Sequence, residues 1–475
     1  MRIRPLCLFM GLALSFGGCE GGSLGLTARN DGSVGVDAGT RLDMSVADGG
    51  PAIDSGLDFD MGAGVDLGTV DLGTVDLGTD MGSMPVITCA TANYPAGTSL
   101  RRRPYQQSVT TNAAHIVWTT AAMGSPTIRI APTTTGVWST VTPGSGAYST
   151  STTGASAAYV QHDASLTGLS ADTSYCYEIL DGTTVLANGI SFHTSWTGTP
   201  HPLRVLAFGD SGTGGTAQLA LRDRMTNYEF DIFVHLGDIA YGSGTYTELE
   251  SHFFTVYRDI LDDVPFWPSI GNHEYVTNEG DPYINVYVLP RQALDPVHHE
   301  RYYSFDYGNA HFVSLDSNPE MFDAIGSGSG TDDELDWLAA DLAASTADWK
   351  IVFFHHPAYS SGEHGNEADV DAQFVPIFQE HGVDLVLNGH DHDYERTVPI
   401  WDDAAAPTDP HAITYVVAGG GGGEPRVVSS SWFTAFATDE GNHFLSITID
   451  GCMLRAEAIN TDADVIDSFN LNGCD

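Results

Sequence analysis

Two histidines separated by a single residue are the side chains in this sequence best suited to metal chemistry. His390 and His392 lie in the segment Gly389-His390-Asp391-His392, shortly after the apolar run 383–387. Such a run is typical of a buried strand, so the pair falls where the strand opens into a loop. Alternate side chains of an extended chain point the same way, which places both imidazoles on one side. The pair therefore predicts ligands for two neighbouring metal ions, with ordinary loop histidines as the alternative.

Four further clusters of metal-binding side chains follow apolar runs elsewhere in the chain. They are Gly209-Asp210-Ser211-Gly212, Gly237-Asp238-Ile239-Ala240-Tyr241, Gly271-Asn272-His273-Glu274 and His355-His356-Pro357. Ligands of α/β sheets gather at the carboxyl ends of strands, so carboxylate, phenol, amide and imidazole groups are expected to converge there. Each cluster alone is also compatible with a turn, a helix cap or a core histidine. Five clusters in succession, each at the end of an expected strand, indicate a single site.

The elements that must position these clusters alternate between strands and helices from Leu203 onward. Strands are expected at 203–208, 231–236, 264–270, 310–315, 350–354, 383–387 and 413–418. Helices are expected near 215–228, 246–261, 331–344 and 367–381. This alternation is typical of an α/β domain whose strands are buried on both faces. After Phe444 the pattern returns to strands, with a hairpin turn at 450–451.

The five clusters, in this order, resemble the signature of metallophosphoesterases and, more narrowly, of purple acid phosphatases. Tyr241, three residues after Asp238, and the segment Asp393-Tyr394-Glu395-Arg396 carry the narrower resemblance. The resemblance extends from about residue 88 to the C-terminus. It implies a four-layer α/β/β/α metallophosphoesterase domain preceded by an all-β, fibronectin type III-like sandwich, as in plant-type members of the family.

The resemblance also implies that seven side chains bind two metal ions. The first ion, expected to be Fe³⁺, would be held by Asp210, Tyr241 and His392. The second, expected to be Fe²⁺, Zn²⁺ or Mn²⁺, would be held by Asn272, His355 and His390, and Asp238 would bridge the two. His355 is preferred to His356 because the family places its ligand two residues before the proline. Carboxylate and phenolate oxygens suit a trivalent ion, whereas imidazole and amide groups suit a divalent one.

The activity implied by the resemblance is hydrolysis of phosphate monoesters through attack by a metal-bound hydroxide. His273 and His364 resemble outer histidines of the family that assist the leaving group, although His364 is also compatible with an ordinary loop histidine. The alternative enzyme is a phosphodiesterase or nucleotide pyrophosphatase with the same metals, and loops 276–300 and 359–366 would decide between them. The alternative outside enzymes is a non-catalytic surface binding protein, which predicts missing ligands, and none is missing.

The first 85 residues predict export and a tether. Arg2, Arg4 and the apolar run 6–16 resemble a signal peptide, and Gly17-Gly18-Cys19 resembles a bacterial lipoprotein cleavage box. Residues 1–19 are thus expected to be a lipoprotein-type signal peptide with lipidation at Cys19, and the protein to be an outer-membrane or periplasmic lipoprotein. Ordinary secretion is the alternative. Residues 20–85 repeat Val-Asp-Leu-Gly-Thr three times and predict a disordered acidic linker.

Residues 86–197 predict the all-β sandwich, and residues 203–475 the catalytic domain with a C-terminal β extension. Short β-rich runs in the first segment are separated by Gly, Pro, Ser and Thr. Four cysteines remain once the signal is removed and Cys19 is lipidated. An oxidising compartment favours disulfides, and proximity within the expected domains favours the pairs Cys89–Cys176 and Cys452–Cys474.

The net charge of the chain limits the classes of partner that it is expected to bind. The sequence has 475 residues with 62 acidic and 18 basic side chains, a net charge of −44. A chain this acidic lacks the basic face that nucleic acids and anionic membranes require. We therefore expect a small phosphorylated substrate, no nucleic acid, and contact with a membrane only through the lipid at Cys19. The oligomeric state cannot be inferred from the sequence.

Overall fold

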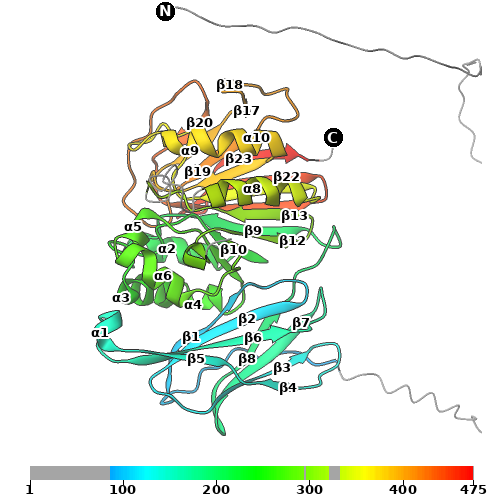
Figure 1. Ribbon diagram of the computed structural model, residues 1–475, viewed down its shortest axis with the longest axis vertical. Helices are drawn as coiled ribbons and strands as arrows, with labels where there is room; N and C mark the ends of the chain where they lie inside the picture. The colour runs from blue at the N-terminus through cyan, green and yellow to red at the C-terminus, as the bar shows by residue number, and fades with distance from the viewer. Residues whose placement is uncertain (1–85, 294–295, 320–331, 474–475) are drawn as a thin grey trace, which may run out of the picture. The chain divides into compact units, whose positions relative to one another are not determined.

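Two β-sheets stacked face to face form the centre of the C-terminal domain in the computed structural model, which describes residues 86–293, 296–319 and 332–473 (Figure 1). The expected signal peptide, the acidic linker and Cys474 lie outside the described residues. None of the helices in the described ranges is long and apolar enough to cross a membrane.

The first sheet joins the expected α/β strands to the C-terminal hairpin. Its order is β11 (Phe266–Pro268), β10 (Ile232–His235), β9 (Leu203–Phe208), β21 (His443–Asp450), β22 (Met453–Asn460) and β23 (Val465–Asn472). Strands β9, β10 and β11 are parallel, and β21 pairs antiparallel with β9. The last three strands therefore extend the sheet that carries the first three clusters.

The second sheet carries the two histidine clusters. Its order is β12 (Tyr303–Tyr307), β13 (Ala310–Ser314), β14 (Trp349–Phe354), β15 (Leu385–Asn388), β19 (Thr414–Ala418), β16 (Tyr394–Thr397) and β20 (Thr434–Thr438). The four strands from β13 to β19 are parallel, as expected from their apolar runs. Strands β12, β16 and β20 pair antiparallel with their neighbours and were not expected from the sequence.

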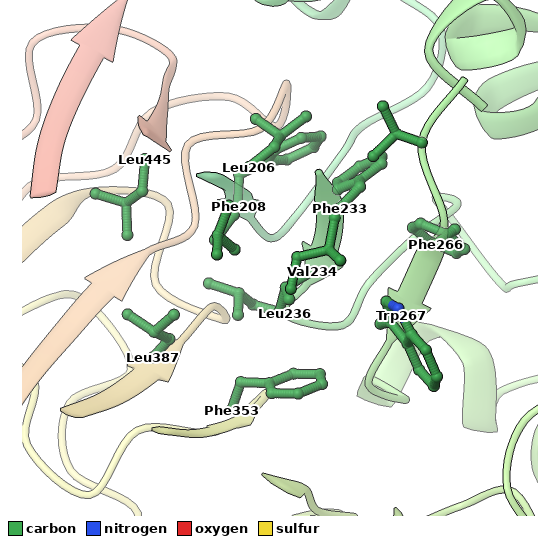
Figure 2. Packing of buried hydrophobic residues seen from close by; sticks show 14 of the residues in the cluster. Leu206, Phe208, Phe233, Val234, Leu236, Phe266, Trp267, Phe353, Leu387 and Leu445 are labelled. Carbon is green, nitrogen blue, oxygen red and sulfur yellow. The ribbon is translucent and has the colours of Figure 1, made fainter. Parts of the chain in front are cut away.

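The period-two alternation of side chains divides the core between the sheets from the core under the helices. Phe353 and Leu387 of the second sheet belong to the same buried cluster as Val234 and Leu236 of the first (Figure 2). The intervening Val352 packs in a separate cluster, with residues of the helices that cover the second sheet. The central strands of each sheet thus bury both faces, one against the other sheet and one against helices.

Helices cover the two outer faces and complete four layers. Side chains of α2 (Thr216–Met225) and α4 (Thr255–Leu261) pack on the first sheet, and α4 follows α3 (Tyr246–Glu248) through a π-helical segment, Leu249–Phe254. Side chains of α8 (Asp332–Ala344), α9 (Ala368–Gln373) and α10 (Val375–His381) pack on the second. The helix expected at 367–381 is divided because Pro376 cannot continue a preceding helix. The predicted α/β/β/α architecture is confirmed.

The N-terminal described region is a sandwich of two four-stranded antiparallel sheets. One has the order β1 (Leu100–Gln107), β2 (Ala113–Thr120), β6 (Tyr159–Thr167) and β5 (Gly144–Tyr148). The other has the order β4 (Ser139–Val141), β3 (Pro126–Pro132), β7 (Ser174–Asp181) and β8 (Thr184–His193). Ile116 and Trp118 face the core of the sandwich, whereas Val117 between them packs in the core of the α/β domain. The sandwich thus uses one face of its first sheet to contact that domain.

The predicted disulfide between Cys89 and Cys176 is confirmed, with the two Cα atoms 5.3 Å apart. It ties the start of the sandwich to β7. Cys452 is also disulfide-bonded. Its predicted partner, Cys474, lies outside the described residues.

Candidate metal centre

The clusters predicted from the sequence converge at one edge of the stacked sheets. Asp210 and Asp238 follow β9 and β10 of the first sheet, whereas His355 and His390 follow β14 and β15 of the second. Asn272 begins the short helix α5 (Asn272–Tyr275) after β11. The carboxyl ends of these parallel strands meet, so the two sheets supply one site together.

Three of the predicted ligands form a first group. The Tyr241 hydroxyl donates to Asp210 Oδ1 over 2.7 Å and lies 2.9 Å from His392 Nε2. His392 Nε2 is 3.5 Å from the same carboxylate oxygen. Burial, reinforced by the Asp210 charge, raises the pKa of Tyr241 well above its ordinary value. Only a strongly attracting cation would convert this phenol to phenolate.

Three other predicted ligands form a second group. His355 Nε2 lies 2.9 Å from Asn272 Oδ1 and 3.2 Å from His390 Nδ1. Burial and the positive charge of His355 both lower the pKa of His390, which favours a neutral imidazole. The Nδ1 of His355 bonds to the Leu236 carbonyl over 2.9 Å, which fixes the ring and directs Nε2 into the group.

Asp238 joins the two groups, because ligand atoms of Asp210, Asp238 and His355 all lie within 4.8 Å of one another. Its Oδ2 is 3.3 Å from His355 Nε2, and its Oδ1 accepts from the His273 backbone N–H over 2.9 Å. Burial alone would raise the pKa of Asp238, but His355 and His273 hold it below its ordinary value. Conversely, burial would lower the pKa of His355, but the Asp238 carboxylate raises it to about 9. A metal ion that binds here must displace that proton.

The backbone at the ligands is held in an unusual conformation. Asp210, Asp238 and His390 have φ values of 61°, 53° and 72°, in the left-handed region that side chains other than glycine rarely adopt. Neighbouring glycines allow the close approach. A Cβ on Gly389 would lie 2.5 Å from Asp210 Oδ2, and one on Gly271 would lie 2.3 Å from Asp238 Oδ1. Such strain is retained where the surrounding structure over-determines it, as at functional sites.

Buried carboxylates outside the ligand set hold the loops in place. Glu274 accepts the backbone N–H groups of Ile239 and Gly271 over 2.9 and 3.0 Å, which fixes the loop that carries Asp238. Burial, with the nearby Asp238 charge, raises the pKa of Glu274 to about 8. Asp391, between the two histidines, accepts from the backbone N–H of His364 over 2.8 Å. A structural role for Asp391 was expected from its place between the two histidines, whereas the role of Glu274 was not predicted, because it depends on contacts between distant segments.

His252 positions Tyr241 from the other side. Its Nδ1 bonds to the Tyr241 carbonyl over 2.6 Å, and the residue belongs to the π-helical segment that interrupts the expected helix. Such segments are frequent at functional sites. No feature of the local sequence pointed to this contact.

The two histidines expected near the leaving group occupy different places. His273 Nδ1 bonds to the Gly242 carbonyl over 2.7 Å, and its Nε2 lies 3.6 Å from Asp238 Oδ2. The ring of His364 lies 4.3 Å from that of His390, and its Nε2 accepts a hydrogen bond from Arg426. Both side chains therefore border the two groups without belonging to either.

His356 is closer to the centre than the sequence suggested. It forms, with His355 and His390, a set whose ligand atoms all lie within 4.8 Å of one another. However, its Nδ1 bonds to the Ser317 hydroxyl over 3.0 Å, and burial, with the positive charge of His355, lowers its pKa to about 3. We interpret His356 as a neutral neighbour that supports His390.

The donor set fits metal ions better than it fits an ion-pair network. Asp210, Asp238 and His355 also place ligand atoms within 4.8 Å of one another, and all three are buried. Two carboxylates thus lie side by side, which is unfavourable unless cations lie between them. Oxygen donors prevail in the first group and imidazoles in the second, which suits one hard and one borderline ion.

The fold and this donor set define a phosphoesterase domain of a known kind. The calcineurin-like phosphoesterase family matches residues 203–394, which include all seven predicted ligands. Residues 203–394 therefore form a calcineurin-like phosphoesterase domain.

Comparisons with individual proteins and with a solved structure show similarity to purple acid phosphatases. Purple acid phosphatase 21 of Arabidopsis thaliana is 28% identical over 236 residues, 47% of this chain and 52% of that protein. An uncharacterised protein of Mycobacterium tuberculosis is 29% identical over 315 residues, 59% of each chain. The structure of purple acid phosphatase PPD1 from yellow lupin (Lupinus luteus) covers 81% of this chain and 74% of its own, with a TM-score of 0.65 and 20% identity. The chain thus has purple acid phosphatases among its homologues and shares their fold, while it spans only 52–59% of the two curated relatives.

Proposed function

We propose that this protein is a purple acid phosphatase-type enzyme that hydrolyses phosphate monoesters at two metal ions. The observation that carries the proposal is that the two ligand groups meet at Asp238, whose carboxylate lies within 4.8 Å of ligand atoms of Asp210 and His355. Asp210, Tyr241 and His392 would hold Fe³⁺. Asn272, His355 and His390 would hold Fe²⁺, Zn²⁺ or Mn²⁺. When bound, such a pair of ions binds the phosphate oxygens, lowers the pKa of water and stabilises the charge of the transition state.

The protein's own residues supply orientation and a proton. The Gly242 carbonyl accepts a bond from His273 Nδ1, so the proton lies on Nδ1 and the second nitrogen faces Asp238. When the imidazole is protonated, Nε2–H is directed toward the centre and can donate to the oxygen of the leaving group. Glu274 and Asp391 keep the ligand loops fixed while charge develops, so no reorganisation is required at that moment.

Metal analysis and a substrate panel test this proposal directly. The full chain, purified from its exporting host, is expected to contain iron and a second metal in a ratio near one to one. It should hydrolyse a phosphomonoester faster than a phosphodiester. Bound metal without turnover of a monoester, a diester or pyrophosphate would contradict the enzymatic proposal.

The visible spectrum tests the assignment of the first ion. A phenolate bound to Fe³⁺ absorbs visible light through charge transfer, so the purified protein should be coloured. Tyr241→Phe removes only the hydroxyl that contacts Asp210 and His392 and should abolish the band. Tyr275→Phe is the matched control, since its hydroxyl bonds to Asp316 and not to a predicted ligand. An unchanged band in Tyr241→Phe would exclude this residue as the ligand.

We also propose that the protein is exported and anchored through a lipid at Cys19. The disulfide between Cys89 and Cys176 supports an oxidising compartment. Labelled fatty acid should be incorporated into the wild type and not into Cys19→Ser. Recovery of labelled Cys19→Ser would refute lipidation at this residue.

A further inference from the structure

A run of five glycines carries one arginine to the rim of the metal centre. Gly419–Gly423 follow β19, and Gly421 and Gly423 donate backbone bonds to the carbonyls of Gly209 and Asp210 over 2.9 and 3.0 Å. A Cβ on Gly421 would lie 2.3 Å from the Gly209 oxygen. The run therefore lies flush against the strand end that bears Asp210, and the chain beyond it emerges beside the ligands.

Arg426 is fixed at both its backbone and its side chain. Its backbone N–H donates to the His392 carbonyl over 3.0 Å. Its guanidinium donates to His364 Nε2, and the His364 ring lies 4.3 Å from that of His390. The positive charge of Arg426 is thus separated from His390 of the second ligand group by the His364 ring.

The charge of Arg426 is weakly neutralised compared with that of other arginines. Among the described residues, the carboxylate nearest to it is Glu363, 3.8 Å away, and that side chain is 67% exposed. By contrast, Arg396 lies 2.7 Å from Asp467, and Arg102 lies 2.8 Å from Glu250. The whole chain has a net charge of −44, yet this guanidinium has only a distant, exposed carboxylate partner. It is therefore available to bind an anion beside the site.

We propose that Arg426 determines substrate specificity by binding an anionic group on the leaving-group side of the substrate. This inference rests on the proposed function. The phosphoryl group would occupy the metal centre, and a second phosphate or a carboxylate would contact the guanidinium, whose planar fork matches both groups. Phosphoanhydrides and esters of phosphorylated or carboxylated alcohols form the favoured class.

Pyrophosphate is the simplest member of that class. Water adds to one phosphorus, the bond from that phosphorus to the bridging oxygen breaks, and the electron pair leaves with the second phosphate. The proton released by the water is taken up by a phosphate product, so atoms and charge balance. Arg426 would hold the departing phosphate throughout. The acidic surface repels such a leaving group, and salt screens that repulsion beyond about 8–10 Å, whereas the guanidinium acts at contact distance.

A comparison of two substrates tests the inference. The ratio of kcat/KM for pyrophosphate to that for phenyl phosphate, whose leaving group has no second charge, is measured in the wild type, Arg426→Gln and Arg426→Lys. Arg426→Gln should lower the ratio by about 10- to 100-fold, mostly through KM, because one charge-assisted contact is lost. Arg426→Lys should retain part of the preference, since it keeps the charge without the fork. Arg455→Gln, at an exposed arginine paired with Glu457, is the matched control and should leave the ratio unchanged.

Several outcomes would overturn the inference. An unchanged ratio in Arg426→Gln would do so, as would an equal loss for both substrates, which would indicate that Arg426 only positions His364. If the wild type hydrolyses neither compound, the proposed function fails. In that case the affinity for pyrophosphate is measured by calorimetry in the metal-loaded wild type and Arg426→Gln. Equal affinities would overturn the inference. If Arg426→Gln loses its metals, Arg426→Lys carries the same measurements.

Discussion

The contact between the sandwich and the α/β domain and the candidate metal centre both bury polar side chains, but they differ in what those side chains face. On β1, Gln106 and Gln107 donate to the backbone carbonyls of Asp262 and Phe266 over 2.8 and 2.7 Å. The Gln107 oxygen also accepts from the Val288 N–H, so both ends of this amide are paired within the folded chain. In the metal centre, the buried carboxylates of Asp210 and Asp238 have oxygen atoms within 4.8 Å of each other, a repulsion of like charges that protein groups alone do not remove. A buried polar side chain that is paired with backbone groups indicates a structural role, whereas two buried carboxylates side by side are suited to binding a cation.

Removing the carboxylate shared by the two ligand groups should have the largest effect on the centre. Asp238→Ala is expected to lose both metals and to lower kcat/KM by more than about 100-fold, the upper range for residues that only support a ligand. Metal content and initial rates measure both effects. A chelator should lower the unfolding temperature of the wild type but not of Asp238→Ala, because metal bound to the native state stabilises it. Retention of both metals in Asp238→Ala would show that the two ligand groups do not depend on a shared carboxylate.

A change at the sandwich contact should affect stability and leave the metals in place. Gln107 donates to the Phe266 carbonyl and accepts from the Val288 N–H over 2.8 Å. Gln107→Met keeps the length of the side chain but leaves two buried backbone groups without partners, at about 1–3 kcal/mol each. Chemical denaturation should show this loss, whereas Gln379→Met on α10 should cost less than about 0.5 kcal/mol. Loss of metal in Gln107→Met would show that the two regions are coupled.

His311 shares features with both regions. Its buried imidazole is paired within the protein, as at the sandwich contact, but its partners are two carboxylates, as in the metal centre. Its Nδ1 lies 2.7 Å from Asp306 and its Nε2 2.8 Å from Asp341. Burial alone would lower the pKa of His311, but the two carboxylates raise it to about 9. A raised histidine pKa stabilises the folded state fully below its unfolded value of about 6.5, and that contribution is lost as the pH rises through 9.

The expected loss at His311 is of the order of 2 kcal/mol between pH 6.5 and pH 9, since one pKa unit corresponds to about 1.4 kcal/mol. Denaturation curves at several pH values measure it. His311→Gln should flatten the stability profile in this window while leaving metal content unchanged. A profile identical to that of the wild type would mean that the two carboxylates do not hold the proton.

The sequence predicted the strand ends well because the same residues end an apolar run and supply the candidate ligands. Polar clusters such as Gly237–Tyr241 directly follow apolar runs, and parallel strands bring such ends together. The expected α/β strands also lie close to their observed bounds; for example, β9 spans Leu203–Phe208 as predicted. Local composition was sufficient in these places because burial on both faces requires nearly continuous apolar residues.

Features that depend on contacts between distant segments could not be predicted. Strand β16 has a polar sequence, Tyr394–Thr397, and becomes a strand because β19 and β20 flank it. Glu274 matters because its carboxylate reaches Ile239, a contact that no spacing in the chain reveals. The same holds for Arg426, whose importance arises only after the glycine run brings it to His364.

The glycine run has a consequence for how this enzyme class could diversify. A Cβ at any position from Gly419 to Gly423 would lie within about 2.1–2.7 Å of another atom, so no other amino acid fits without displacing the ligand loops. Some side chains beyond Arg426 face solvent instead, since Val427 and Trp432 are 75% and 52% exposed. Positions that exclude a side chain and positions that expose one to solvent are thus adjacent in one loop. For a protein engineer, the exposed positions among residues 427–432 are a place to introduce new substrate contacts, while Gly419–Gly423 hold this loop against the candidate ligands.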